Sequence, residues 1–285
     1  MTPDLRTIPN GAYSAWVRDF YPRAKSKGIS ASTLHKSFRN TGYLPSVVKR
    51  DRNQTEFKRT LEDYLSITTS DEPVSKGHAA FARHRRILNT LESKYGVDAE
   101  IIAAIWGLES FFGERRGDVS VISATSTLAF DGRRGSFFEK QLIAALKIIQ
   151  NGNISASRMI GGWAGSMGHT QFIPTWQQAF AVDFTGDGRR DIWSDDPTDA
   201  LASTATYLQR NGWTRGVGSG AETSLSDGNV IQPQAGGLKF TAKGIFVQSN
   251  ATITRMPTRL VWGISQIALV VVGLCAPTFH PIKTA

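Results

Sequence analysis

The sequence predicts a mainly α-helical protein with a small β-containing appendage. Three observations favour this fold class. Apolar side chains recur at helical spacing between residues 12 and 211, whereas residues 214–250 become rich in Gly, Ser, Thr and Gln. The 285 residues, 40% of them hydrophobic, are enough to bury a sizeable core in one large domain or two small ones.

The individual elements follow from local patterns. Apolar periodicity predicts helices at residues 12–27, 54–66, 76–95, 99–112, 137–151 and 198–211. The third of these ends near Gly96, and Asp98 is placed to cap the start of the fourth. Two short runs in the appendage, 238–241 and 245–248, are predicted as strands.

Charge and composition narrow the function classes. The chain holds 33 Lys and Arg residues against 24 Asp and Glu residues, and the resulting net charge of +9 favours an anionic partner. No Lys- and Arg-rich run with interleaved aromatic residues is present, so nucleic acid is not expected as a partner. The single cysteine, Cys275, excludes an internal disulfide, a cysteine-based zinc site and a CxxC redox centre.

The two ends of the sequence lack standard targeting elements. No secretory signal peptide is visible at the start, because no basic segment is followed by an apolar one. Residues 261–276 are nearly all apolar and carry no charge, but a membrane-spanning helix needs about 20 such residues. Membrane contact through this tail is therefore not expected; a short tail anchor is the alternative.

Glu109 is the best candidate for a catalytic group. It lies in the middle of a predicted apolar helix, with Trp106, Leu108, Phe111 and Phe112 within one turn. A carboxyl group in such surroundings is poorly solvated, which raises its pKa and favours the protonated form. A general acid needs that form to protonate a glycosidic oxygen at neutral pH. The alternative is an ordinary carboxylate on the polar side of an amphipathic helix.

Two further segments carry residues suited to ligand binding. The glycine-rich run 161–174 lets the backbone pass close to a ligand, and its His169 and Gln171 add hydrogen-bonding groups. Arg133 and Arg134 follow an Asp-Gly pair and are able to bind an anionic group bidentately. The alternatives are a tight loop with an internally bonded histidine, and two merely exposed arginines.

Residues 183–191 begin like the calcium loop of an EF-hand. Oxygen-bearing side chains occupy positions 1, 3 and 5 and glycine occupies position 6; these residues are Asp183, Thr185, Asp187 and Gly188. Position 12 is Ser194 in place of the usual glutamate. The closing carboxylate has three candidates: Asp195, Asp196 and Asp199. One loop alone argues against a paired calcium sensor, and a solvated Asp/Gly turn is the alternative.

These motifs, in this order, resemble the lytic murein transglycosylase B family of bacterial enzymes that cleave peptidoglycan. The similarity runs from about Ala15 to Trp213. The matching motifs are Gly28-Ile-Ser30, Asp51-Arg-Asn-Gln-Thr-Glu-Phe57, Tyr95-Gly-Val97, Trp106-Gly-Leu-Glu109, Trp163-Ala-Gly165, Met167-Gly168, Gln171-Phe-Ile-Pro174 and the loop from Asp183 to Trp193.

The resemblance implies a lysozyme-like helical core with an EF-hand-like calcium loop. The division that we expect is an N-terminal helical region (1–90), a catalytic core (91–213) with the calcium loop at 183–199, a small β-containing segment (214–255) and an atypical apolar tail (256–285). A monomer is expected. The cellular location, periplasm or cell envelope, is inferred from the substrate alone.

The resemblance also implies the reaction. Glu109 would be the only catalytic acid and base, because the nucleophile in such enzymes belongs to the substrate. It would protonate the oxygen between N-acetylmuramic acid and N-acetylglucosamine and then deprotonate the C6 hydroxyl that attacks C1. The product is a 1,6-anhydromuramic end, and no water is consumed. A muramidase that hydrolyses the same bond, and a non-catalytic peptidoglycan-binding protein, are the alternatives.

The same match assigns roles to residues outside the catalytic helix. Gln171 would line the cleft, Gly162 stands where some members have serine, and Phe137 stands where some have tyrosine. Arg133 and Arg134 would face peptide or lactyl carboxylates of the glycan strand. Calcium would be held by Asp183, Thr185, Asp187, the carbonyl of Arg189 and Asp199, the last after allowing for two extra residues near 194–196. No organic cofactor is implied.

The tail departs from the family pattern. Members normally end with a polar helix carrying a Tyr-Asn motif, which is missing here. Back-translating residues 260–273 with permitted codons and dropping two bases gives a sequence that looks like that helix. The sequence therefore predicts a frameshift in the gene between about residues 245 and 260, and reading the DNA tests it.

Overall fold

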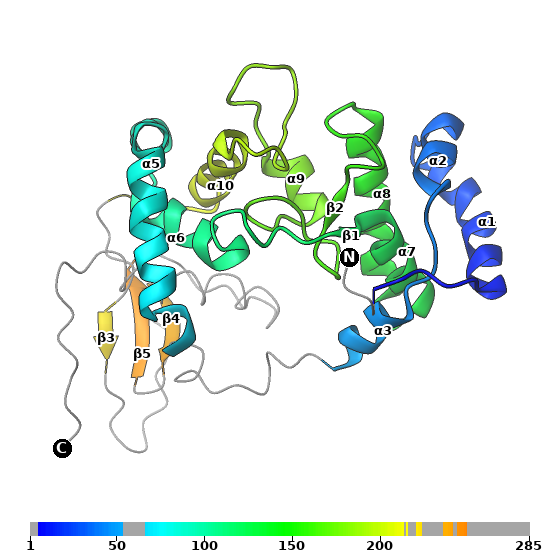
Figure 1. Cartoon of the computed structure of the whole chain (residues 1–285), viewed down its shortest axis with the longest axis horizontal. Coiled ribbons are helices and arrows are strands. Elements are labelled where there is room, and N and C mark those ends of the chain that lie inside the picture. The colour runs from blue at the N-terminus through cyan, green and yellow to red at the C-terminus, as the bar shows by residue number, and fades with distance from the viewer. Residues whose placement is uncertain are drawn as a thin grey trace. The chain divides into compact units, whose positions relative to one another are not determined.

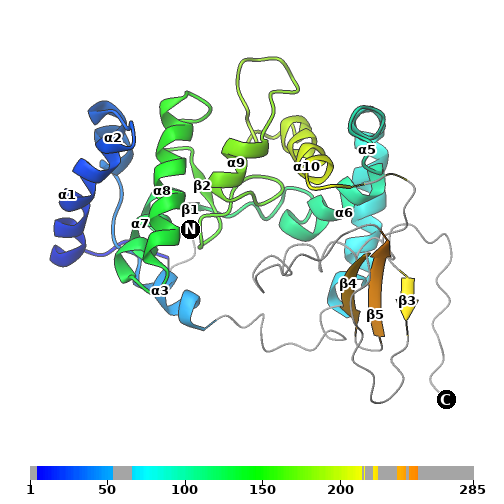
Figure 2. The same ribbon diagram turned by 180° about the vertical axis from the view of Figure 1, so that it is seen from behind.

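Helices dominate the secondary structure (Figures 1 and 2). The computed structural model describes residues 5–53, 66–213 and 215, and the backbone of three strands between residues 221 and 249. The helices are α1 (Gly11–Ser26), α2 (Ala31–Phe38), α3 (Pro45–Arg52), α5 (Asp71–Tyr95), α6 (Ala99–Ser110), α7 (Val121–Asp131), α8 (Gly135–Gln150), α9 (Pro174–Phe180) and α10 (Thr198–Arg210). The predicted mainly helical class is therefore confirmed.

The strands are short and form two small sheets. β1 (Val119–Ser120) pairs antiparallel with β2 (Ile160–Gly161). The other sheet has the order β3-β5-β4, formed by Ala221–Thr223, Gly244–Ser249 and Gly236–Thr241. The predicted strands 238–241 and 245–248 lie within β4 and β5, so the β-containing appendage is confirmed. Residues 250–285 lie outside the described residues, and with them the apolar tail, Cys275 and most of the proposed frameshift range.

Four of the described helices, α2, α3, α7 and α9, were not predicted from the sequence. α2, α3 and α9 have at most eight residues each, and a short helix shows too little of the pattern. α7 is buried on all sides, so it has no polar stripe. Its hydroxyl groups are satisfied internally, since Thr125 and Ser126 each donate a 2.6 Å bond to the carbonyl four residues earlier. The predicted helix 54–66, except for its last residue, lies outside the described residues.

The chain divides into two compact units that alternate along the sequence. The first comprises Met1–Phe57 and Gly113–Tyr207, and the second comprises Lys58–Phe112 and Leu208–Ala285. The four ranges predicted from the sequence are consecutive, whereas each of these units combines two separate segments of the chain, so the predicted division stays a prediction. None of the helices in the described residues is long and apolar enough to cross a membrane.

The first unit is built around the paired helices α7 and α8, with α1 and α2 packed against them (Figure 1). Its core includes Leu44, Val47, Leu128 and Phe138, all at most 2% exposed. Aromatic rings extend this core: Tyr13 and Tyr43 each meet the edge of Phe130, and Trp16 stacks on Phe20 at 5.4 Å. These contacts fix α7 and α8 and the loop between them, which carries the arginine pair.

In the second unit, α5 packs on α6. Leu88 and Leu91 of α5 and Ile102 of α6 are fully buried. Asp98 occupies the N-cap position of α6 as predicted, but its side chain makes no capping hydrogen bond. It accepts a 3.1 Å bond from the Trp213 indole nitrogen instead, which ties the segment after α10 to the start of the helix that carries Glu109.

Candidate active site and cation site

Glu109 lies in the last turn of α6, next to an unusual helix end. Phe111 and Phe112 follow with φ angles of 53° and 59°, in the left-handed region that non-glycine residues avoid. Their amide groups donate to the carbonyls of Gly107 and Trp106, which closes the helix. Two such residues cost about 1–3 kcal/mol each, and strain of this kind concentrates at functional sites.

The rings around this turn are packed against the helix. Trp106 is 3% exposed and meets the edges of His84 and Phe112, with ring centres 5.1 and 5.6 Å away. A side chain at Gly107 would place its Cβ 2.6 Å from the Phe112 ring, so only glycine lets this ring lie on the helix. The apolar surroundings predicted for Glu109 are therefore present, except that the helix ends one residue after it.

The Glu109 carboxyl is partly buried, and this burial raises its pKa from the usual value near 4.5 to about 7. Among the described residues, none donates a hydrogen bond to this carboxyl or pairs with it. Desolvation therefore acts without a compensating positive charge, which favours the neutral acid. At neutral pH a large fraction of the group is protonated and the rest is ionised, as a group that serves as acid and then as base requires.

Gln171 lies in the first unit in a strained backbone conformation, with φ of 48°. Its side-chain nitrogen donates to the carbonyls of Arg116 and Gly168, at 3.1 and 2.8 Å, and its oxygen accepts a 2.7 Å bond from the Ser166 hydroxyl. Both amide protons are thus used within the protein. What remains for a ligand is a lone pair on the amide oxygen, so Gln171 can accept a hydrogen bond but not donate one.

Gly162 lies beside the same hydrogen-bonded group. A Cβ at this position would lie 2.6 Å from the Ser166 hydroxyl and 3.2 Å from the Gln171 oxygen. The hydroxyl of Ser166 therefore fills the space that a side chain at position 162 would enter. This arrangement gives a physical reason for glycine where some family members are expected to have serine.

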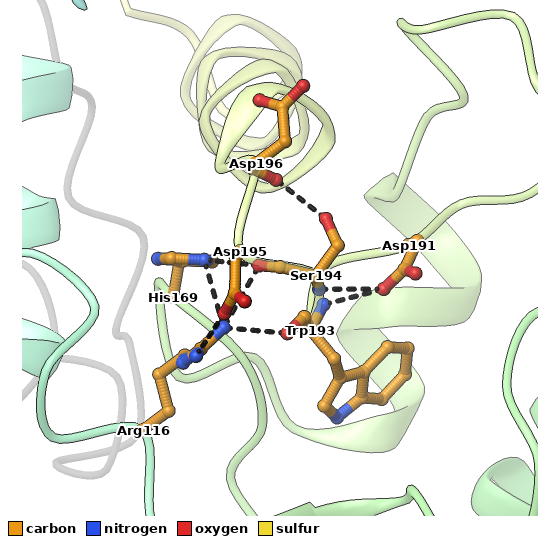
Figure 3. Close-up of polar contacts among 7 residues, drawn as sticks. All are labelled: Arg116, His169, Asp191, Trp193, Ser194, Asp195 and Asp196. Carbon is orange, nitrogen blue, oxygen red and sulfur yellow. Dashed lines mark hydrogen bonds and ion pairs between the residues drawn. The ribbon is translucent and has the colours of Figure 1, made fainter.

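Arg116 joins three loops of the first unit (Figure 3). Its guanidinium donates to the carbonyls of Trp193 and Ser194, at 2.7 and 2.9 Å, and to the Asp195 carboxylate at 2.8 Å. This contact holds the pKa of the Asp195 carboxyl below its usual value. His169 is 3% exposed and its Nε2 lies 2.7 Å from the Ser194 carbonyl. The internally bonded histidine, the alternative noted from the sequence, is thus the observed state.

Arg116 also lines a pocket of about 650 Å³. The lining residues are Gly113, Glu114, Arg116, Gly117, Asp118, Ser157, Arg158, Ile160, Trp193 and Asp195. Arginines, carboxylates, a hydroxyl and an indole occur together, which is a lining suited to a polar, uncharged or weakly charged ligand such as a saccharide. The pocket walls come from three segments of the first unit, within residues 113–118, 157–160 and 193–195.

The acidic loop, residues 183–199, brings together three of its predicted metal ligands. Carboxylate oxygens of Asp183, Asp187 and Asp199 lie within 4.8 Å of one another. Asp183 organises the turn, because it accepts bonds from the amides of Gly186 and Gly188 at 2.7 and 2.8 Å. The Thr185 hydroxyl lies 3.4 Å from Asp183. Carboxylates gathered in this way are the hard oxygen donors that Ca²⁺ prefers.

Of the three candidates for the closing carboxylate, Asp199 is the one that lies with Asp183 and Asp187. It is 2% exposed and accepts bonds from the amides of Phe184, Thr185 and Asp191. Burial raises the pKa of its carboxyl despite these donors. Asp195 pairs with Arg116, and Asp196 accepts a bond from Thr198. The backbone amide of Arg189 donates to Asp187 at 2.9 Å, which places Arg189 in the loop beside the three carboxylates.

Arg133 and Arg134 lie on the loop between α7 and α8 and bind one buried carboxylate. Asp51, 2% exposed, accepts a 2.7 Å bond from Nε of Arg133, and its other oxygen accepts from Arg134. Arg134 also lies over the Phe138 ring at 4.9 Å. Phe137, in the first turn of α8, is 40% exposed. The arginines are therefore not merely exposed, the alternative considered from the sequence.

The structure brings Gln171 together with Gly162, and Asp183 with Asp187 and Asp199. Sequence reasoning gave no role to Asp51, Arg116 or Ser166. Asp51 opens one of the recognised motifs, which could have marked it. No local sequence pattern marks Arg116, because the partners of its side chain lie 53 to 79 residues away. Ser166 is one small residue among several in the glycine-rich run, and its bond to Gln171 depends on how that loop folds.

Comparison with known proteins decides the family. The model of the transglycosylase SLT domain matches residues 12–256. The chain belongs to this family. The match is longer than the range recognised from motifs, and it ends where the apolar tail was expected to begin.

Two bacterial proteins are similar to this chain over part of their length. The membrane-bound lytic murein transglycosylase B of Escherichia coli K12 is 33% identical over 177 residues, which cover 55% of this chain and 48% of that protein. SltB3 of Pseudomonas aeruginosa, solved with NAG-NAM-pentapeptide and with NAG-anhNAM-pentapeptide, is 46% identical with a TM-score of 0.73; the match covers 77% of this chain and 59% of SltB3. The chain thus spans about half of the former and less than two thirds of the latter.

A more distant structure supports the fold. Escherichia coli Slt35, solved in complex with calcium, is 23% identical with a TM-score of 0.72 over 92% of this chain and 93% of Slt35. The lysozyme-like helical fold expected from the sequence is confirmed by these structures.

Proposed function

We propose that this protein is a lytic transglycosylase that cleaves the β-1,4 bond between N-acetylmuramic acid and N-acetylglucosamine in peptidoglycan. The observation that carries this proposal is the partly buried Glu109 carboxyl, with a pKa of about 7 and no charged partner among the described residues. Family membership and the SltB3 complex with NAG-anhNAM-pentapeptide support it.

One carboxyl group acts twice in the proposed reaction. Protonated Glu109 donates its proton to the glycosidic oxygen, and the bond from C1 of the muramic acid to this oxygen breaks. The N-acetyl carbonyl of the substrate stabilises the positive charge at C1. The Glu109 carboxylate then takes the proton of the C6 hydroxyl, whose oxygen bonds to C1 and closes the 1,6-anhydro ring. Glu109 thus regains the proton that it donated. Because the C6 oxygen is the nucleophile, no water is consumed.

Residues of the first unit would bind the glycan strand. Gln171 would accept a hydrogen bond from a sugar hydroxyl through its amide oxygen, and Gly162, with no side chain, would leave the contact between Ser166 and this oxygen undisturbed. Phe137 offers an exposed ring to a sugar face or peptide stem. Arg133 and Arg134 would bind a carboxylate of the peptide or of the lactyl group.

Calcium would be a structural ion in this protein. Asp183, Asp187 and Asp199 would supply carboxylate oxygens, with the Thr185 hydroxyl and the Arg189 carbonyl completing the set. When bound, the ion would neutralise three clustered negative charges and fix the loop that leads to Trp193 and Asp195.

The remaining assignments follow from the substrate. Peptidoglycan strands would be the partner, in the periplasm or elsewhere in the cell envelope, and nucleic acid is not expected. No organic cofactor is required by the proposed reaction. A monomer would suffice, because each named role is filled by one chain.

The proposal is tested by incubating wild-type protein and Glu109→Gln with intact peptidoglycan and analysing the soluble products by mass spectrometry. Wild type is expected to release anhydro-muropeptides, and Glu109→Gln none. Products from both proteins would remove Glu109 from the reaction. Reducing-end muramic acid would indicate a hydrolytic muramidase. Binding without release by wild type would indicate a non-catalytic binding protein.

A further inference from the structure

The arginine pair is held by an arrangement of charges that the sequence did not predict. Asp51 lies in the last turn of α3, and both of its carboxylate oxygens point at guanidinium groups: Nε of Arg133 at one, Nη2 of Arg134 at the other. Nη2 of Arg133 also donates a 2.6 Å bond to the Asp51 main-chain carbonyl. One buried residue thus fixes two side chains from the loop between α7 and α8.

A second ion pair also joins α3 to this region, but here the arginine lies on α3 and the carboxylate at the end of α7. Arg52 of α3 donates a 2.7 Å bond to Asp131 at the end of α7. Three guanidinium groups therefore meet two carboxylates, which leaves one positive charge in excess. Arg52 pairs with Asp131, so the excess charge lies on Arg133 and Arg134, which share Asp51. Their side chains are 46% and 27% exposed, whereas that of Asp51 is 1% exposed.

The bonds to Asp51 decide which donors remain for a ligand. Arg133 uses the edge formed by Nε and Nη2, so Nη1 stays available at its exposed end. Arg134 uses Nη2, and its Nε is buried with no hydrogen-bond partner in the described structure. The start of α8 adds to the attraction for an anion, because its first turn has no acidic residue and no side-chain cap.

We propose that Asp51 is a positioning residue that presents Arg133 and Arg134 to a single carboxylate of the peptidoglycan ligand. The inference rests on the proposed function, since it concerns how that ligand is recognised. Asp51 contacts no ligand itself. It prevents the two like charges from separating and leaves one net charge, which matches one carboxylate rather than a dianion.

Asp51→Asn distinguishes positioning of the arginines from net charge alone, because the two predict opposite changes in the affinity for an anionic ligand. Removing the carboxylate raises the local charge, so long-range attraction alone would tighten binding of an anion. Loss of the buried partner frees both guanidinium groups, so bidentate recognition weakens. We expect the dissociation constant for NAG-NAM-pentapeptide to rise about tenfold, while that for the neutral tetra-N-acetylchitotetraose stays unchanged.

The experiment uses calorimetric titration of the full chain carrying Glu109→Gln, so that no ligand is consumed. Asp51→Asn, Arg133→Lys and the charge-preserving control Arg52→Lys are compared, and thermal unfolding checks each fold. Arg133→Lys keeps the charge and the fold but loses the planar fork, so it keeps the test decisive if Asp51→Asn unfolds. It should weaken binding of the peptide ligand about tenfold, whereas Arg52→Lys, which keeps the charge at an arginine whose side chain pairs with Asp131 and not with Asp51, should not.

The outcomes separate the two proposals. If the parent protein binds both ligands and neither Asp51→Asn nor Arg133→Lys weakens the pentapeptide ligand selectively, the positioning role is wrong and the proposed function stands. Equal weakening of both ligands also overturns the positioning role, because it reports a general structural defect. If the parent binds neither ligand, the proposed function fails and the inference with it.

Discussion

The side-chain amide of Gln171 donates a 3.1 Å hydrogen bond to the main-chain carbonyl of Arg116, whose guanidinium in turn holds the carbonyls of Trp193 and Ser194. These bonds connect the glycine-rich loop to the end of the acidic loop. The acidic loop continues the connection, because Asp191 accepts bonds from the amides of Trp193 and Ser194 and donates its own amide to Asp199. The proposed ligand and cation sites of the first unit thus share one hydrogen-bonded framework.

Arg116→Lys tests this framework. Lysine keeps the charge but cannot reach two carbonyls and a carboxylate from a planar group. We expect the free energy of unfolding to fall by about 1–3 kcal/mol, measured by urea denaturation. Arg158→Lys, which changes another arginine of the same pocket, is the control and should leave stability within about 0.5 kcal/mol of wild type. Equal stability of both variants would show that the Arg116 bonds contribute little.

Gly162→Ala tests the contact among Gly162, Ser166 and Gln171. The new Cβ would displace the Ser166 hydroxyl, so the bond to Gln171 is lost at a cost of about 1 kcal/mol. Ser166→Ala loses the same bond directly. We therefore expect the double variant to cost no more than either single variant in a double-mutant cycle. Additive losses would mean that the two positions act independently.

Removal of Asp199 tests the cation site. Ca²⁺ that binds only the folded protein stabilises it by about 2.7 kcal/mol at a hundred times its dissociation constant. Wild type should therefore melt at a higher temperature with added Ca²⁺ than with a chelator, and Asp199→Asn should lose most of this difference. Asp196→Asn is the matched control and should keep it. The same calcium shift in Asp199→Asn would remove Asp199 from the site.

The raised pKa of Glu109 predicts a pH-dependent stability. The folded state holds its Glu109 proton up to about pH 7, whereas the unfolded state loses it near pH 4.5. The folded state thus binds more protons in this window, and the Glu109 contribution to stability falls as pH rises through it. Allowing for partial exposure, Glu109→Gln should exceed wild type by about 1–2 kcal/mol at pH 8 and match it at pH 4. A difference independent of pH would contradict the raised pKa.

The sequence predicted the positions of the longer helices well, because their patterns depend on residues close together in the chain. α1, α6, α8 and α10 lie within two residues of their predicted bounds. α1, α8 and α10 have a periodic apolar face, whereas α6 is a continuous apolar run that follows Asp98. α7 was missed since it is buried all round, and α5 begins five residues earlier than predicted, at Asp71, where its acidic first turn breaks the apolar pattern. Helical periodicity depends on a contrast between an apolar and a polar face, which α7 lacks.

The candidate site shows the same limit. The apolar sequence around Glu109 correctly indicated a poorly solvated carboxyl, and the spacing of Asp183 and Asp187 indicated their approach. The partner of the arginine pair could not be found in this way, because Asp51 lies 82 residues before Arg133. Nor could the sequence choose among Asp195, Asp196 and Asp199, since that choice depends on how α10 begins against the loop.

Water incorporation tests the central proposal, that Glu109 acts as acid and then as base without hydrolysis. Wild-type protein is incubated with intact peptidoglycan in H₂¹⁸O, and the muropeptides released are weighed by mass spectrometry. The account predicts anhydro-muropeptides whose mass is the same as in ordinary water, because the C6 oxygen of the sugar forms the new bond. Muropeptides with ¹⁸O at the muramic acid end would contradict it and identify a hydrolase.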